Sequence, residues 1–300
     1  MGSISERVHI KFASDHKPQE PTSTLVLTLP SGRFVDVRIL KRAFKPSQKE
    51  EPSDSGYSQA VGAIQDLDWA FSGLATAKSL TWDEIPTEMG RMKLKVEQSL
   101  LGAITANKGR DGIVTSEREM NELAHAEQTK ARARSCFWSH IIDSREIVLG
   151  TTDTLDQGIV FQTDVEGEEL ERGGMLNPAT AVWEEYEELW RDIEIISPPW
   201  MRRKFVCWHC EPLGSDIGHI KSVFIRVGQF AQGILVGKGW VEAERWEADF
   251  EHGRWKCAAR VGNGPANRES QFATLLDLEN SYLSRRAEID GIQWEMEAYD

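Results

Sequence analysis

Gly291-Ile-Gln-Trp-Glu-Met-Glu-Ala-Tyr299 is the stretch that decides the fold class of this 300-residue chain. Its apolar and polar residues alternate strictly, so that Trp294, Met296 and Ala298 share one face and polar residues share the other. A period of two is typical of a β-strand with one buried and one wet face. Further segments built around an aromatic or an amide have the same character, at residues 67–73, 136–143, 186–192 and 226–233. The sequence therefore predicts a mainly β protein.

A β-hairpin is predicted near the N-terminus. Thr24-Leu-Val-Leu-Thr-Leu29 reads as one strand, Pro30-Ser-Gly supplies turn residues, and residues 33–40 read as a second strand. In the second strand Val35, Val37 and Ile39 fall on one face, as expected for a sheet that is wet on one side. Residues 45–60, rich in Pro, Ser, Lys and Glu, are predicted to form a mobile loop.

The hydrophobic period changes between about residues 84 and 134. Ser116 followed by Glu119 forms a capping-box pattern at the head of a helical stretch. Few large apolar residues follow, so the packing face of this helix is narrow. The stretch is therefore predicted to be a helical insertion that decorates a β domain.

A Gly/Glu-rich stretch at residues 166–178 is the best candidate for a domain boundary. Beyond it the chain becomes a run of closely spaced strands, and Gly228, Gly233 and Gly237 would permit the bends of a small barrel. The sequence predicts an N-terminal β-barrel over residues 1–175, with the insertion at about 84–134, and a C-terminal β-barrel over residues 176–300.

Composition limits the classes of function. The formal charge of -13 disfavours a general binder of nucleic acid or of anionic membranes, because both surfaces would repel the chain. No apolar run is long enough to span a bilayer, and four cysteines in this length do not resemble a disulfide scaffold. A soluble, cytoplasmic protein with a basic partner fits these features best.

Five segments together resemble one protein family. They are Trp69-Ala-Phe-Ser-Gly73, Phe137-Trp138 with Asp143, Glu187-Glu-Leu-Trp190, Val227-Gly-Gln-Phe-Ala-Gln-Gly233 and Gln293-Trp-Glu-Met-Glu-Ala-Tyr299. In this order the chain resembles the fungal HRI-one family, whose yeast member is named as an interactor of a casein-kinase-one homologue. The resemblance implies two consecutive antiparallel calycin-like, or lipocalin-like, β-barrels. It also implies a cytoplasmic protein, with the nucleus as a second location, and no established catalytic residues.

Cys207-Trp-His-Cys210 admits two interpretations. Cys-x-x-Cys with an intervening histidine can bind zinc or carry out redox chemistry. Residues three apart on a strand point to opposite faces, however, and no second paired cluster supplies further ligands. Core packing is the favoured interpretation, and neither a metal site nor a cofactor is predicted.

Candidate ligand-binding residues lie in both predicted barrels. Trp138 and His140 share a strand face, with Asp143 just beyond, and an imidazole there could act as an acid, a base or a ligand. A hydrogen-bonded structural histidine is the simpler alternative. In the second half Arg226, Gln229 and Gln232 could line a barrel mouth or only bond at the surface. The ligand-binding candidates are Trp69, Trp138, His140, Arg226 and Trp294.

An acidic run on one predicted strand suits a basic protein partner. Glu184, Glu185 and Glu187 lie close to Trp190, so that charge and an aromatic anchor are neighbours in the sequence. A solvated rim beside a buried tryptophan is the alternative. These four residues are the partner-contact candidates.

Three functions follow, in order of preference. The first is a non-enzymatic protein that acts through protein contacts, with a kinase or the transport machinery as candidate partner. The second is a lipocalin-like protein that binds a small apolar molecule in a barrel cavity. The third is an isomerase or cyclase of fungal specialised metabolism, for which His140 would be the first proton-transfer candidate. No catalytic residue is predicted outside that third reading.

Overall fold

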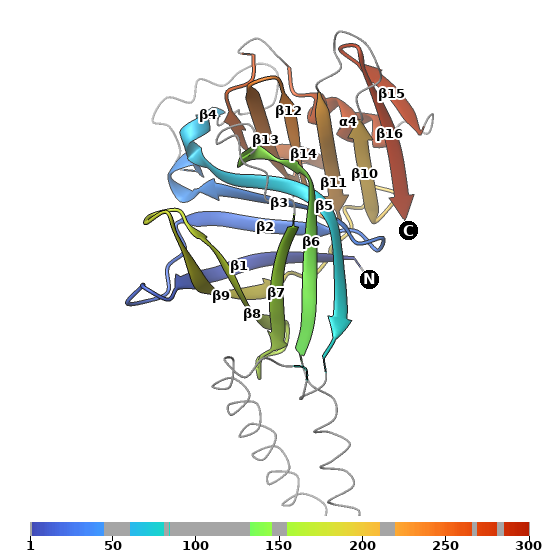
Figure 1. Cartoon of the computed structure of the whole chain (residues 1–300). Coiled ribbons are helices and arrows are strands. Elements are labelled where there is room, and N and C mark those ends of the chain that lie inside the picture. Colours follow the sequence, from blue (N-terminus) through green and yellow to red (C-terminus); the bar gives the residue numbers. More distant parts are fainter. Residues whose placement is uncertain are drawn as a thin grey trace, which may run out of the picture.

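The computed structural model describes residues 2–44, 61–80, 84, 133–145, 155–210, 220–265, 269–280 and 285–299. These residues are mainly β, as predicted (Figure 1). In chain order the elements are β1 (Ser3–Phe12), β2 (Thr22–Thr28), β3 (Arg33–Leu40), the 3-10 turn η1 (Lys41–Phe44), β4 (Val61–Ala63), the 3-10 turn η2 (Ile64–Asp66), β5 (Leu67–Ser79), β6 (Ala133–Asp143), β7 (Leu155–Gln162), β8 (Glu168–Asn177), β9 (Val182–Asp192), β10 (Phe205–Cys210), β11 (Lys221–Val227), β12 (Phe230–Gly237), β13 (Trp240–Asp249), β14 (Arg254–Gly262), α4 (Gln271–Asn280), β15 (Arg286–Ile289) and β16 (Ile292–Tyr299).

The first half forms a closed antiparallel barrel. Its strands follow the order β1-β2-β3-β5-β6-β7-β8-β9, and β1 pairs with β9 to close the circle. The predicted hairpin is confirmed as β2 and β3. Because side chains alternate across a strand, β3 sends Asp36 and Arg38 into the barrel and Val35 and Val37 to its outer surface.

The second half contributes seven strands to an open sheet of eight, in the order β15-β16-β10-β11-β12-β13-β14-β4. The eighth strand, β4, comes from the first half of the chain and pairs in parallel with β14. The two-barrel prediction is therefore confirmed for the first half, while the second half differs from it. The end strands β15 and β4 do not pair with each other, and α4 supplies Phe272, Leu275 and Leu276 to the apolar cluster on one face of the sheet. A helix that covers this face buries its apolar side chains without closure of the sheet.

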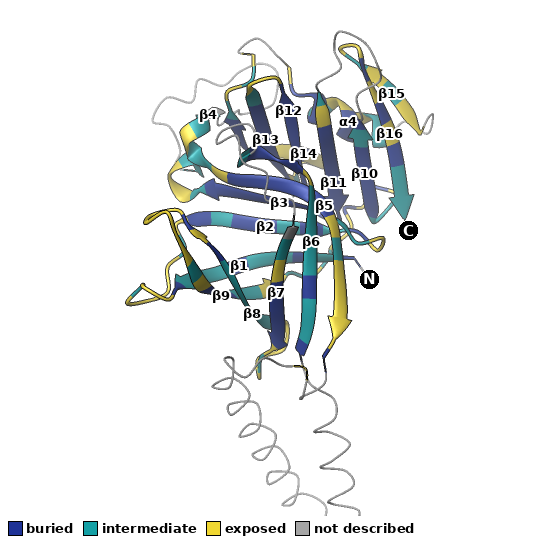
Figure 2. Cartoon of the chain, viewed as in Figure 1, coloured by how far each residue is buried: buried dark blue, intermediate teal, exposed yellow. Residues whose placement is uncertain are grey.

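The two halves share one hydrophobic core. The outer surface of β2 and β3 packs against the other face of the second sheet, and Leu27, Val37, Ile225 and Ile234 are all fully buried in that cluster. Figure 2 shows β3 and β11 buried along most of their length. The barrel wall thus also serves as the packing surface of the second sheet.

A buried arginine bonds the two halves together. Arg245 of β13 donates to the backbone carbonyl of Val37 at 2.7 Å and to the hydroxyl of Ser23 at 2.7 Å. Gln232 of β12 donates to the carbonyls of Leu25 and Val35. Burial lowers the pKa of Arg245 to about 10. These bonds fix the register between the barrel and the sheet, because the donors of Arg245 and Gln232 meet particular carbonyl and hydroxyl oxygens of β2 and β3.

The predicted boundary between residues 175 and 176 falls inside β8. The Gly/Glu-rich stretch that suggested a linker is the β8 strand, and the chain leaves the barrel only after β9 ends at Asp192. The predicted mobile loop at 45–60 lies outside the described residues. The predicted helical insertion at about 84–134 also does, apart from Glu84 and the first residues of β6.

The core-packing interpretation of the cysteine pair is confirmed. Cys207 belongs to the cluster between the halves and Cys210 to the cluster under α4, so the two thiols lie on opposite faces of β10. Burial raises the pKa of the Cys207 thiol to about 12. Among the described residues no group of three or more His, Cys, Asp or Glu side chains is placed to hold a metal ion.

Candidate ligand-binding site in the closed barrel

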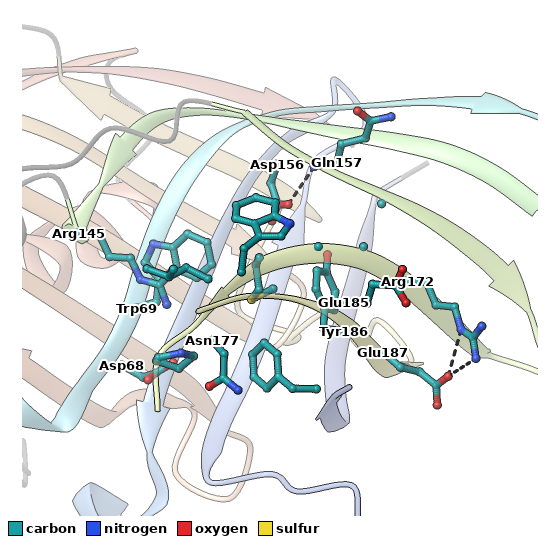
Figure 3. Close-up of a pocket in the computed structure, with 18 of the residues that line it drawn as sticks. Asp68, Trp69, Arg145, Asp156, Gln157, Arg172, Asn177, Glu185, Tyr186 and Glu187 are labelled. Carbon is teal, nitrogen blue, oxygen red and sulfur yellow. Dashed lines mark hydrogen bonds and ion pairs between the residues drawn. The ribbon is translucent and has the colours of Figure 1, made fainter. Parts of the chain in front are cut away.

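A cavity of about 1210 Å³ opens into the barrel where two neighbouring strands of the wall, β7 and β8, stop pairing. The pairing of β7 with β8 ends at Gly158 and Gly173, whereas β8 stays paired with β9 as far as Asn177. Asp156 and Gln157 line the cavity from β7 (Figure 3). Gly174 and Met175 line it from β8. The splayed strands therefore give access to the interior from the side.

One edge of the cavity carries an ordered polar group centred on Asp143. This carboxylate accepts the indole N–H of Trp69 at 2.8 Å and the backbone N–H of Arg145 at 2.8 Å. Its second oxygen lies 2.9 Å from Nδ1 of His140. The His140 ring stacks on Phe71 at 4.3 Å, and its side chain is only 2% exposed. The imidazole is therefore held on one nitrogen while Nε2 has no hydrogen-bond partner.

A bulge in β6 creates this group. Phe71 pairs with Asp143, Ser72 with Ile142 and Gly73 with His140, so Ile141 is an extra residue. One inserted residue changes which side chains share a face, and so residues 140 and 143 point the same way. Gly73 makes the bulge fit, because a Cβ there would stand 1.5 Å from the carbonyl oxygen of Ser139.

Arg145 follows directly on the same edge. Its guanidinium carbon lies 3.6 Å from the centroid of the Trp69 ring, a cation–π contact. Figure 3 shows Arg145 against Trp69 on one side of the cavity and the paired Arg172 and Glu187 on the other. Burial, followed by the nearby charge of Arg38, lowers the pKa of Arg145.

The interior next to this site holds a buried ion network. Arg38 pairs with Asp36 at 2.9 Å and with Glu188 at 3.4 Å, and Arg7 binds the same Glu188 and also Glu20. Arg38 also lies over Trp69, at 4.9 Å. The network joins β1, β3 and β9, while the buried Oδ1 of Asp36 has no hydrogen-bond partner among the described residues.

A model of one protein family matches residues 3–297 of the chain; its description is "Protein HRI1". The chain belongs to this family. The HRI1 match spans both the barrel and the second sheet, so the cavity lies within the shared region. The resemblance drawn from the sequence motifs is therefore confirmed.

The fold of this HRI1-family chain is similar to the crystal structure of an uncharacterized protein, YLR301w, from Saccharomyces cerevisiae. The TM-score is 0.58 with 13% identity, over 100% of both chains. At this identity the likeness shows the fold alone. No curated protein matches the chain. Among the described residues no helix is long and apolar enough to cross a membrane.

The five ligand-binding candidates separate in this HRI1-family structure. Trp69 and His140 line the cavity, and Trp138 packs on the aromatic cluster that contains Trp69. Arg226 instead forms an ion pair with Glu279 of α4, and Trp294 is fully buried against Phe272 under the same helix. These last two belong to a filled core. Gln229 and Gln232, also considered for a barrel mouth, bond to backbone groups.

The four partner-contact candidates divide between two faces of β9. Glu184 and Trp190 share the inward face with Tyr186, and Glu184 accepts bonds from Ser14. Glu185 and Glu187 point to the outer face, where Glu187 pairs with Arg172. The three acids therefore do not surround Trp190 on one face of this strand. Partner binding at these residues stays a prediction.

Several residues at the cavity of the HRI1-family barrel were not predicted. Arg145 stands only two positions beyond Asp143, but its contact with Trp69 has no sequence signature. Asp156 and Tyr186 reach the cavity through pairings between distant segments. The signal that was available is the short spacing of His140 and Asp143 after a tryptophan.

A buried carboxyl beside the cavity makes stability depend on pH. Tyr186 donates to Glu171 at 2.6 Å, and burial raises the pKa of Glu171 from 4.5 to about 8. The folded state then retains a proton that the unfolded chain releases. The contribution of Glu171 to stability is thus fully present below about pH 4.5 and is lost as the pH rises through 8, by on the order of a few kcal/mol. The Glu171→Gln variant should remove most of this decline, measured by urea unfolding at about pH 5.5 and about pH 8.5.

The matched control is Glu187→Gln, because Glu187 is a partly exposed acid on the neighbouring strand. Its pH dependence should follow that of the unmodified protein. Burial also raises the pKa of Glu244 to about 7, in the second sheet, so a residual slope of the same sign should remain in Glu171→Gln. Equal slopes in all three proteins would show that Glu171 does not retain the proton.

Proposed function

We propose that the closed barrel binds a small organic molecule in its cavity, as calycin-like barrels do. The observation that carries this proposal is the cavity of about 1210 Å³, lined by apolar and polar side chains together. Ligand sites have volumes of several hundred Å³ and combine an apolar lining with a few polar groups. The ordered group around Asp143 adds polar atoms in fixed positions, which is what recognition of one orientation requires.

The proposal is tested with N-phenylnaphthylamine, an uncharged fluorescent probe. The probe should bind at one site per chain, with a rise in fluorescence. Met175 is buried and lines the cavity, so Met175→Trp should fill part of it and weaken binding at least about tenfold. The control Phe250→Trp also introduces a tryptophan, at an exposed position in the second half, and should leave binding unchanged.

Thermal unfolding of both variants distinguishes a filled cavity from a damaged fold. If both variants bind the probe as tightly as the unmodified protein, or if neither this probe nor an acidic analogue binds the unmodified protein, the cavity is not a ligand site. Native mass spectrometry of the purified protein gives a second readout, because a bound cellular molecule would appear as added mass.

A role in protein contacts is the second candidate. The hairpin of β8 and β9 exposes Leu176, Val182 and Trp183, with Trp183 66% exposed, next to the exposed acid Glu185. An apolar group beside acids suits a basic partner, with a kinase or the transport machinery as candidates and a cytoplasmic or nuclear location. The acidic charge argues against nucleic acid as that partner. A chain that binds no probe but is recovered with a stoichiometric protein would favour this role.

A proton-transfer enzyme is the third candidate, an isomerase or cyclase acting on the bound molecule. His140 supports it, since Asp143 orients one nitrogen and leaves the other for a substrate. A product profile that does not change when the gene is deleted would argue against this reading.

A further inference from the structure

Two cationic or ionisable groups at the cavity lack partners of their own. The Nε2 atom of His140 is buried and has no hydrogen-bond partner. Among the residues that the structure describes, no carboxylate lies within ion-pair distance of the Arg145 guanidinium. Both groups touch Trp69, since the His140 ring meets it edge-on at 5.6 Å and Arg145 lies over it at 3.6 Å. Trp69 therefore brings the two groups to the same part of the cavity.

The neighbouring charges do not supply the missing partner. Asp143 is occupied by Trp69 and His140. Asp68 and Asp156 line the cavity and act on Arg145 only through space, and Asp156 already accepts the N–H of Gln157. Arg38, which faces the same tryptophan, is paired with Asp36 and Glu188. Arg145 is the arginine of this cavity that is left for a ligand.

We propose that the cavity binds an organic acid, with its acidic group between Arg145 and Nε2 of His140 and its apolar body against Met175 and Phe12. This inference rests on the proposed ligand-binding function and adds the class of ligand. A guanidinium offers several N–H donors to an acid oxygen, and an imidazole oriented by Asp143 can accept an acid proton or donate one. Phe12 and Met175 belong to one apolar cluster that borders the cavity.

An ammonium group is disfavoured beside Arg145, whereas the carboxylates of Asp68 and Asp156 in the same lining would attract one. An ammonium group at this edge would meet the Arg145 guanidinium, and desolvation strengthens repulsion between like charges. A fully apolar ligand would bury Arg145 and Nε2 of His140 without partners, which costs free energy for each group. An acid satisfies both groups at once.

Two probes that share one aromatic skeleton test the inference. Anilinonaphthalene sulfonate carries an acidic group, and N-phenylnaphthylamine lacks it. The Arg145→Gln variant should bind the sulfonate at least about tenfold more weakly, because a charge-assisted bond is lost. The same variant should bind the uncharged probe within about twofold of the unmodified protein.

Arg191→Gln is the matched control. Arg191 is half-exposed on β9, pairs with Glu168 and does not line the cavity, so both probes should bind this variant as they bind the unmodified protein. A His140→Gln variant should also weaken the sulfonate selectively. In addition, the sulfonate should shift the imidazole nitrogen resonances of His140 in the unmodified protein, a readout that needs no substitution.

The binding results distinguish the acid anchor at Arg145 and His140 from the proposed ligand-binding function. If the uncharged probe binds and the sulfonate binds Arg145→Gln as tightly as the unmodified protein, the acid anchor is wrong while the ligand site stands. Equal weakening of both probes by Arg145→Gln would also overturn the anchor. If neither probe binds the unmodified protein, the proposed function fails and the anchor fails with it.

Discussion

Replacing Gly73 by alanine should lower the free energy of unfolding by about 4 kcal/mol or more. A Cβ at this position would stand 1.5 Å from the carbonyl oxygen of Ser139, and that oxygen belongs to the backbone, so no side-chain rotation can relieve the clash. The pairing of β5 with β6 would have to open at the bulge. His140 and Asp143 would then lose their alignment, so probe binding should fall together with stability. Urea unfolding and probe titration measure the two effects.

Gly253→Ala is the control for this experiment. Gly253 has a φ of 62°, in the left-handed region, yet a Cβ there would meet nothing within 4 Å. Only backbone strain remains, which costs about 1–2 kcal/mol. If Gly73→Ala is no more costly than Gly253→Ala, close approach of the two strands is not what the glycine provides.

Trp294→Ala should have a comparable effect on stability in the second half. The indole is fully buried, with Phe272 of α4 at a ring distance of 6.1 Å, and its removal leaves a large cavity under the helix. Core truncations of this size cost about 3–5 kcal/mol. Chemical unfolding followed by tryptophan fluorescence measures the loss.

The same truncation at an exposed tryptophan supplies the comparison. Trp183 is 66% exposed, so Trp183→Ala should change stability by about 0.5 kcal/mol or less. Trp294→Ala should also bind the uncharged probe normally under conditions where it stays folded, because Trp294 does not line the barrel cavity. Loss of probe binding in the folded variant would show that Trp294 contributes to the ligand site.

Alternation along single strands was the reliable signal in this sequence. It identified β3 and β16. One face of β16 is exposed, as the alternation predicts, whereas both faces of β3 are buried, so the wet face expected on that strand is wrong. Alternation could not distinguish a closed barrel from an open sheet, since both need strands with one apolar face. The difference depends on α4, whose Phe272, Leu275 and Leu276 have a helical spacing in a stretch where strands dominate on both sides.

The candidate site could be predicted only in part, because its geometry also depends on how strands pair. Trp69, His140 and Asp143 were singled out because aromatic and ionisable side chains cluster in their segments. That His140 and Asp143 share a face depends on the extra residue Ile141, and an inserted residue cannot be read from spacing. The availability of Arg145 depends on the absence of an acid within reach in the described structure, which no local pattern records.

The buried interface between the barrel and the second sheet determines how this protein can be divided into fragments. Val37 faces the sheet while Arg38, its neighbour on β3, holds the ion network inside the barrel. Expressing either half alone would expose the apolar residues buried between the barrel and the sheet. It would also leave the guanidinium of Arg245 without its bond to the Val37 carbonyl. Fragments that end or begin at Asp192 should consequently aggregate. Functional residues are therefore better identified with single substitutions in the full chain.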